Sequence, residues 1–376
     1  MTPPPRKTIL LMLWTTHQHP MRAARGAHRL LQEQGRFDSL LMRTDPDGLA
    51  NVLGARDRSF AGVIGFLPTE KSEQLVLDHN LPAVNVSARL PEQGRPIPRV
   101  IPDNYAVGQL AAEHFIHLGF KHLAYTGVST WYSRLRGAGF VDRLQAEGLA
   151  PVCAETLRGE EIARWLESLP RPLGVLAGTD FEALRVVHAA RSLALRVPED
   201  VAVIGVDNTE LVCELADVPL SSVDTAGEEV GYRAAELLTA MIDGATPPEE
   251  SLLVPPSRLV TRESTATVAV KDPLLERALC HIREHACDPI DVNDVVEITG
   301  IPRRTLERQM RAQLGHSPHQ EIRRVQFARA EQLLAQTRLP TREVSRRCGF
   351  GDVRSFLRAF GREFGCTPTE FRRRSG

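Results

Sequence analysis

The last quarter of the sequence repeats a pattern of arginine side chains. Arg304 and Arg354 lie fifty residues apart, and so do Arg308 and Arg358. A guanidinium group can donate two parallel hydrogen bonds to O6 and N7 of guanine, or to a phosphate. This spacing favours the recognition of two neighbouring stretches of DNA by two similar segments.

Apolar side chains recur at every fourth position beside these arginines. The two triplets align with each other: Leu306, Met310 and Leu314 in the first segment, and Phe356, Phe360 and Phe364 in the second. This spacing places the apolar groups on one face of a helix and the arginines on another. Gly300 and Gly349 supply the tight turn that precedes the second helix of a helix-turn-helix motif. We therefore expect two DNA-reading helices.

Aspartates near the ends of three apolar runs are a second set with evident chemistry. Asp103, Asp180 and Asp207 each follow a segment that is typical of a buried strand. Carboxylates accept hydrogen bonds from sugar hydroxyls, and Arg or Asn side chains donate them. For Asp103 and Asp180 a second interpretation stays open, because such residues often cap the next helix.

Alternating strands and helices must position these aspartates. Apolar runs predict buried strands at Ile9–Trp14, Gly62–Leu67, Ala83–Val86, His122–Thr126, Gly174–Ala177 and Val201–Val206. Amphipathic stretches predict helices at Ala106–Leu118, Gly137–Glu147, Phe181–Leu193 and Glu228–Ile242. Such alternation is typical of parallel sheets covered by helices on both faces, which bind ligands beyond the carboxyl ends of their strands.

The sequence from Asp272 onward predicts seven helices and almost no strand. Asp272, Asp291 and Asp352 are the predicted N-caps, and Pro302 opens the first arginine helix. The other helices are expected at Leu274–His285, Val292–Ile298, His319–Gln336, Thr341–Arg347 and Pro368–Arg374. Val268–Pro273 is the predicted boundary, because β-branched residues give way there to helical sequence.

The two parts carry opposite net charges. Residues 271–376 contain 20 Lys and Arg against 14 Asp and Glu, whereas residues 1–270 hold the remaining 26 of the 46 basic and 33 of the 47 acidic residues. A basic tail on an acidic body favours a polyanionic partner for the tail alone. Neither the 12 His nor the six Cys residues show a metal-binding pattern, so we predict no metal and no cofactor.

The N-terminal segment fits neither a membrane span nor a secretion signal. No apolar run in the chain reaches the roughly eighteen residues that a membrane span needs. The first apolar run meets His and polar residues after a few positions, and no small-residue cleavage site follows. We interpret it as the first strand, which implies a cytoplasmic protein with reduced thiols.

Residues Leu274–Arg374 resemble the DNA-binding domain of the AraC/XylS regulators in helix order, spacing and the GF, RAF, FG, TP and FR pattern of the second repeat. The resemblance implies DNA contacts from two sets of residues: Arg303, Arg304, Glu307 and Arg308 in the first helix, and Arg354, Ser355 and Arg358 in the second. At Arg304 the sequence departs from the family, which often has a bulky or aromatic residue there. The second turn is one residue longer than the first, so we expect an asymmetric DNA site.

Several stretches within residues 8–260 resemble the lactose/galactose-repressor family and its periplasmic sugar-binding relatives. They are DNYAVGQLAAEHFIHLGFKHLAY from Asp103, RGAGF from Arg136 and VPEDVAVIGVDN from Val197. The resemblance implies two lobes with a sugar in the cleft between them. The ligand-binding residues implied by position are Asp207 and Arg136 first, then Asp103, Thr179, Asp180 and Asn208, with Arg134 and Thr225 in addition and Trp14 or Trp131 as an aromatic plate. The N-terminal DNA-binding headpiece of that family is not expected, because the first strand starts by Thr8.

The expected fold class is thus α/β, with two-lobed, doubly wound parallel sheets like those of periplasmic binding proteins, followed by an all-α double helix-turn-helix domain. The expected domains are a sugar-binding sensor over residues 1–267, a linker over 268–273 and a DNA-binding domain over 274–376. This combination resembles the xylose-operon regulators. It implies a homodimer on double-stranded operator DNA, D-xylose as the effector, and RNA polymerase as a partner if the protein is an activator.

Other functions are weighed against this one. A regulator of the same architecture that responds to another sugar, or that represses, is the nearest alternative. A transport-type binding protein would need a signal peptide and would not need the basic tail. A sugar-processing enzyme would use paired carboxylates such as Asp207 with Asp103, but the sequence has no nucleophile motif, phosphate loop or metal spacing. We therefore predict a non-enzymatic regulator in which the sugar closes the cleft and repositions the DNA-binding modules.

Overall fold

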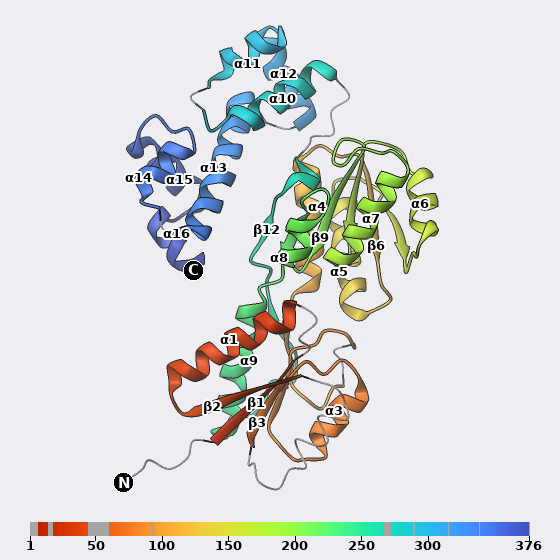
Figure 1. The fold of residues 1–376 in the computed structure, drawn as a ribbon, viewed down its shortest axis with the longest axis vertical. Coiled ribbons are helices and arrows are strands. Elements are labelled where there is room, and N and C mark those ends of the chain that lie inside the picture. Colours follow the sequence, from red (N-terminus) through yellow and green to blue (C-terminus); the bar gives the residue numbers. More distant parts are fainter. Residues whose placement is uncertain are drawn as a thin grey trace. The chain divides into compact units, whose positions relative to one another are not determined.

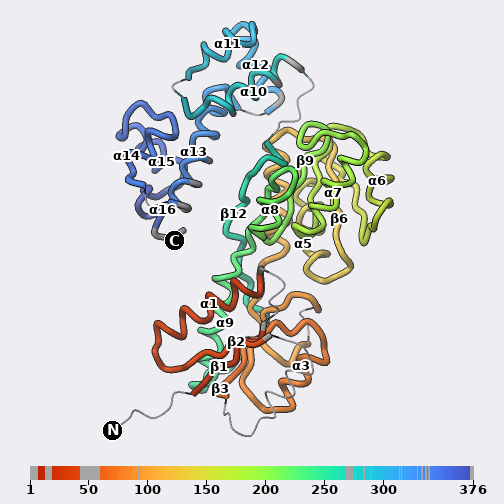
Figure 2. The backbone as a smooth tube through the Cα atoms, in the orientation of Figure 1, coloured from red at the N-terminus to blue at the C-terminus, as the bar shows by residue number. Residues whose placement is uncertain are grey.

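The fold is given by a computed structural model that describes residues 7–13, 18–43, 60–91, 94–266, 272–288, 290–314, 316–337 and 339–375. The chain divides into two units, Met1–Ile116 with Phe120–Ala266, and His117–Gly119 with Thr267–Gly376. Figures 1 and 2 trace the chain through both units. The first unit contains parallel sheets and helices and the second is helical, which confirms the predicted fold class.

The first lobe of the first unit is built on a parallel sheet with the strand order β2-β1-β3-β4. Its strands are β1 (Lys7–Leu13), β2 (Phe37–Arg43), β3 (Phe60–Gly65) and β4 (Ala83–Asn85). The helices of this lobe are α1 (Gln18–Gln34), α3 (Glu70–Leu77) and α9 (Gly227–Ile242). Ile9 and Leu11 pack in one cluster with α1 and α9, while Leu10 and Met12 pack in another with Val76 of α3. Helices therefore cover both faces of this sheet, which explains why β1 is apolar at successive positions from Ile9 onward.

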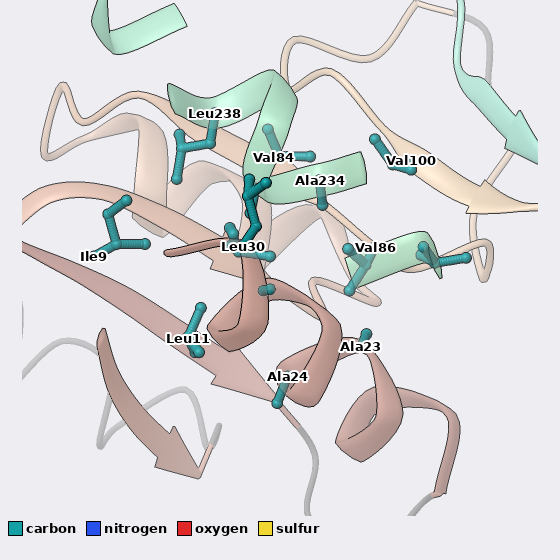
Figure 3. Close-up of a cluster of buried hydrophobic side chains, with 14 of the residues drawn as sticks. Ile9, Leu11, Ala23, Ala24, Leu30, Val84, Val86, Val100, Ala234 and Leu238 are labelled. Carbon is teal, nitrogen blue, oxygen red and sulfur yellow. The ribbon is translucent and has the colours of Figure 1, made fainter. Parts of the chain in front are cut away.

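Helices α1 and α9 pack closely against each other, and Figure 3 shows Ala23, Leu30, Ala234 and Leu238 of these helices in the shared core. Two glycines, Gly26 of α1 and Gly231 of α9, allow the approach. A Cβ atom on Gly231 would lie 1.8 Å from the carbonyl oxygen of Ala23. A side chain at this position would therefore force the two helices apart.

The second lobe is built on a six-stranded sheet with the order β12-β10-β9-β8-β6-β7, in which only the β10–β12 pairing is antiparallel. Its strands are β6 (His122–Gly127), β7 (Val152–Glu155), β8 (Leu173–Ala177), β9 (Val201–Val206), β10 (Ser221–Asp224) and β12 (Arg258–Val260). Its helices are α4 (Asn104–His117), α5 (Trp131–Gln145), α6 (Glu160–Glu167), α7 (Asp180–Ser192) and α8 (Glu210–Leu215). The cluster formed by α6 and α7 includes Leu173 and Val175 of β8, whereas Phe115 of α4 contacts the intervening Gly174. Helices therefore cover both faces of the sheet.

The chain passes between the two lobes at three points among the described residues. It crosses after β5 (Val100–Pro102), returns after β10 into α9, and crosses again after β11 (Leu252–Val254) into β12. Strands β5 and β11 pair in parallel as a separate two-stranded sheet. These crossings lie side by side in the ribbon of Figure 1.

The described part of the second unit contains seven helices and no strand between residues 272 and 375. They are α10 (Pro273–His285), α11 (Val292–Thr299), α12 (Arg303–Leu314), α13 (Pro318–Gln336), α14 (Thr341–Arg347), α15 (Val353–Phe364) and α16 (Pro368–Ser375). Asp272, Asp291 and Asp352 cap α10, α11 and α15 through their side chains, as predicted. Two separate cores form, one around α12 and one around α15, and α13 contributes to both.

Candidate functional site

A cavity of about 430 Å³ lies between the two lobes of the first unit. His19, Phe66 and Arg89 contribute to its wall from the first lobe. The residues of the second lobe that matter for its chemistry are Asn104, Tyr132, Arg136, Thr179, Phe181, Glu182, Arg185 and Asp207. Several of them follow the carboxyl ends of parallel strands, where a doubly wound sheet binds its ligand.

Arg136 is the buried centre of this wall. Its Nε donates to Oδ1 of Asn104 at 2.9 Å, one terminal nitrogen donates to the carbonyl of Gly178 at 2.6 Å, and the other donates to Oδ1 of Asp207 at 3.0 Å. The guanidinium also lies 4.8 Å from the ring centre of Tyr132. One side chain thus holds together the segments that follow β5, β8 and β9. Two of its five N–H groups have no partner in the described part of the chain and can donate to a ligand.

Asp207 sits on a backbone turn that L-residues rarely adopt. Its φ is 101°, and that of Asn208 is 47°. Such conformations persist where the surroundings fix them. Here Arg22 of α1 donates to the carbonyl of Asn208 at 3.1 Å, and Arg262 donates to its Oδ1 at 2.9 Å. The turn leaves Oδ2 of Asp207 without a protein donor among the described residues, so this oxygen can accept a ligand hydroxyl.

Three of the predicted ligand-binding residues line the cavity, namely Arg136, Asp207 and Thr179. Trp14 lies outside the described residues. The remaining predicted residues do not line this cavity: Asp103, Asp180, Asn208, Arg134, Thr225 and Trp131. Their positions show what each of them does in the fold.

Four of these residues support the cavity from behind. Asp103 accepts from the backbone N–H of Ala106 at 2.9 Å and so caps the start of α4. This is the helix-capping alternative that the sequence had left open for Asp103. Asn208 donates to Asp224 at 3.1 Å, and Thr225 contacts the ring of His19 at 3.2 Å. Asp180 is buried and points into the protein.

The other two residues have different positions. Arg134 is exposed on α5. Trp131 begins α5, and its buried Nε1 has no hydrogen-bond partner among the described residues. Neither side chain contributes to the wall of the cavity.

Sequence reasoning missed several cavity residues. Phe66, Tyr132 and Phe181 supply the aromatic surface that was expected from tryptophan. Tyr132 lies one turn before Arg136 on the same helix, so an earlier start for α5 would have found it. Burial lowers the pKa of His19, and its imidazole is therefore neutral at pH 7.

Asp180 makes two short hydrogen bonds inside the second lobe. Its carboxylate accepts from the backbone N–H of Thr209 at 2.6 Å and from the hydroxyl of Ser222 at 2.5 Å. Burial, together with the nearby charge of Asp207, raises the pKa of Asp180 to about 7. The folded protein therefore binds this proton more tightly than the unfolded chain, whose aspartates titrate near pH ~3.9.

We expect Asp180→Asn to flatten the pH dependence of stability. In the natural protein, stability should fall as the pH rises from about 4 through 7, because over this range the folded state retains a proton that the unfolded state has already lost. Melting temperatures measured from pH 5 to 8 should fall less in the variant than in the natural protein. The difference should be roughly 2–4 °C for each kcal/mol of pH-dependent unfolding free energy that the substitution eliminates. Asp217→Asn, at a half-exposed aspartate, serves as the control. If the melting temperature depends on pH equally in Asp180→Asn and in the natural protein, Asp180 is not the group responsible.

The helices α12 and α15 present their arginines to solvent. Arg303, Arg304 and Arg308 are exposed on α12, and Arg354 and Arg358 are exposed on α15. On the opposite faces, Leu306, Met310, Phe356 and Phe360 are fully buried, as the fourfold spacing predicted. Glu307 accepts from Arg303 at 3.1 Å. Ser355 is half-buried, and its N–H donates to the cap residue Asp352 at 2.9 Å.

Helix α13 fixes the two halves of the second unit to each other. Buried Gln326 donates to the carbonyl of Ala286 in the first half at 2.7 Å and to that of Gly349 in the second half at 3.4 Å. Near its start, buried Glu321 accepts from Arg324 and contacts His316 at 2.8 Å. Burial opposes its ionisation, but these partners hold the pKa of Glu321 well below its usual value.

Two parts of the sequence match known domain families. Residues 112–265 match a periplasmic binding protein-like domain, and residues 295–374 match a helix-turn-helix domain. Over its whole length the chain is similar to the xylose operon regulatory protein of Escherichia coli strain K12, with 30% identity over 98% of this chain and 97% of the relative. The chain belongs to the family of xylose operon regulatory proteins. It is accordingly a sugar-responsive transcription regulator with an AraC-type DNA-binding domain, and not an enzyme.

Further members of this xylose operon family support the assignment. The regulatory protein of Haemophilus influenzae is 30% identical over 84% of this chain and 85% of its own length. A solved structure, that of the xylose-binding transcription activator xylR, matches with a TM-score of 0.64 and 29% identity over 98% of both chains. Within the described residues, no helix is long and apolar enough to cross a membrane, and no cluster of three or more His, Cys, Asp or Glu could hold a metal ion.

Proposed function

We propose that this protein is a D-xylose-responsive activator of a pentose-utilisation operon. The observation that carries the proposal is the pairing of Arg136 with Asp207 in the wall of the cavity between the lobes. The pair offers both a charged donor and a charged acceptor to adjacent hydroxyls of one small polyol. D-xylose is chosen because the relatives over the full length of the chain are named for it.

The proposed sugar contacts come from both lobes. Arg136, Asp207 and Thr179 act from the second lobe, and His19 contributes a neutral imidazole from the first. Phe66 of the first lobe provides an apolar plate for the C–H face of the ring. Groups on two lobes that share one ligand favour the closed arrangement, so the sugar shifts the open–closed equilibrium toward closure.

Closure is proposed to act on DNA through a homodimer. The sensor, residues 1–267, would reorient two DNA-binding domains, residues 274–376, through the linker of residues 268–273. The DNA contacts are those expected from the sequence: Arg303, Arg304, Glu307 and Arg308 on α12, and Arg354, Ser355 and Arg358 on α15. RNA polymerase is the proposed partner on the promoter, and the cytoplasm is the proposed location.

Calorimetry and DNA binding together test this function. The full-length protein is titrated with D-xylose, L-arabinose, D-ribose and D-glucose, and its affinity for promoter DNA is then measured by fluorescence anisotropy with and without each sugar. We expect saturable binding of D-xylose and a change in operator affinity of about 5- to 150-fold, the range of ordinary coupling energies. If another sugar alone binds and produces that change, D-xylose is the wrong effector. If D-xylose binds but changes neither DNA affinity nor transcription in vitro, the proposed function is wrong.

A further inference from the structure

A second cavity, of about 520 Å³, lies in the second lobe beside the first one. It is walled by the end of β6, by the loop between β7 and α6, and by α7. Val128, Glu182 and Arg185 line both cavities. The second cavity, which we call the outer cavity, therefore continues the ligand-binding edge of the sheet toward β7.

The ionisable side chains of the outer cavity are Arg158, Arg185 and Glu182. Arg158 and Arg185 are exposed, and the guanidinium of Arg158 has no hydrogen bond or ion pair among the described residues. Glu182 is half-buried, and burial raises its pKa although the positive charges of Arg136 and Arg185 oppose that shift. The wall thus carries two cations and one carboxylate, which leaves the cavity with a net positive charge.

The remaining polar groups of the wall favour the same kind of ligand. Thr126 and Thr156 also line the cavity, and their side chains carry hydroxyl groups. The start of α6 is not among the proposed ligand contacts, because the carboxylate of Glu161 already accepts from the backbone N–H of Arg158 there, at 2.9 Å. The groups best suited to bind an anionic ligand are therefore the guanidinium groups, because their paired N–H donors match the oxygens of a carboxylate or a phosphate.

We propose that the outer cavity binds a small sugar-like molecule through an anionic group, a carboxylate or a phosphate, held by Arg158 and Arg185. The cavity is too large for the anion alone, so the group is attached to a body that extends along Leu157 and Ile162. The regulator thereby senses an acidic or phosphorylated sugar in addition to its neutral effector. This site does not depend on which neutral sugar fills the first cavity.

Calorimetry with acidic and neutral sugars tests the site in the full-length protein. D-xylonate and D-ribose 5-phosphate are titrated into protein whose first cavity is already saturated with D-xylose, and neutral D-ribose is titrated in the same way as the reference. We expect at least one of the charged ligands to bind 10-fold or more tightly than D-ribose. A gain with D-xylonate identifies the carboxylate, and a gain with D-ribose 5-phosphate identifies the phosphate.

Three variants assign the gain to the outer cavity. Arg158→Gln and Arg185→Gln should each remove it, whereas Arg164→Gln, at an exposed arginine of α6 that does not line the cavity, should retain it. Arg158→Gln is the sharpest variant, because it should leave D-xylose affinity unchanged. The DNA-binding arginines are present in every variant, so phosphate binding to them cancels in the comparison. The proposal is overturned if neither charged ligand gains affinity, or if the gain persists in Arg158→Gln.

Discussion

Asp207→Ala is expected to weaken D-xylose binding at least 100-fold while leaving non-specific DNA binding intact. The substitution removes a charged acceptor, and hydrogen bonds to charged groups contribute about 1.5–3 kcal/mol each. It also leaves the buried guanidinium of Arg136 without its ion-pair partner. Both effects act on the cavity, so the affinity for random-sequence DNA, measured by anisotropy, should not change.

A second variant separates loss of the sugar contact from loss of the fold. Alanine tolerates the φ of 101° at position 207 poorly, and Arg136 loses its counter-charge, so Asp207→Ala should also melt at a lower temperature. Asp207→Asn keeps the shape and one acceptor oxygen and should fold normally, but we expect it to bind D-xylose about 10-fold more weakly. Asp217→Ala, at a half-exposed aspartate of the same lobe, should bind like the natural protein. Normal D-xylose binding by Asp207→Asn and Asp207→Ala in calorimetry would refute the cavity assignment.

The parallel sheets could be predicted from the sequence because both of their faces are covered. Complete coverage makes strands such as Val201–Val206 apolar at every position, and such a run is visible without knowledge of its neighbours. Helix α1 shows the opposite case. Its sequence is rich in Arg and Gln, and its burial depends on α9, which lies some two hundred residues further along the chain. Contacts of that kind leave little local signal, and α1 was not predicted.

The sequence did not show which aspartates face the cavity. Their directions are set by neighbouring residues in the folded chain. Asp180 turns inward because Gly205 has no side chain, and a Cβ there would lie 2.3 Å from its Oδ1. Asp207 faces the cavity because Asn208 is held in a left-handed turn by Arg22 and Arg262. Both effects arise between segments distant in sequence. A motif can therefore identify a strand end without giving the direction of its side chain.

The arginine helices were easier to predict, since their pattern is contained within one helix each. Burial every fourth residue was enough to separate the inner from the outer face of α12 and α15. The sequence did not show how individual polar groups are engaged. Glu307 is half-buried and already accepts from Arg303, so a base must compete with that arginine for its carboxylate. Arg308, in contrast, has no partner among the described residues.

Arg308→Ala and Arg358→Ala are each expected to reduce specific operator affinity by about 1–3 kcal/mol, the amount that one bidentate base contact supplies. The two residues occupy matching positions on α12 and α15, which pack in separate cores. Because they share no partner, the losses should add in the double variant. Anisotropy titrations with operator DNA and with random DNA measure the specific and the non-specific affinity. The affinity for D-xylose should stay unchanged in all three variants.

The pattern of loss across DNA sequences distinguishes base reading from phosphate binding. An arginine that reads a base should weaken operator binding far more than random-DNA binding, and should relax the preference at one base pair. An arginine on a phosphate should weaken both equally and reduce the dependence of affinity on salt. Arg233→Ala removes the same charge from an exposed site on α9 in the first unit and should affect neither. Equal losses on every DNA sequence would show that Arg308 and Arg358 position the protein on the phosphate backbone, and base reading would then have to come from Arg304 and Arg354.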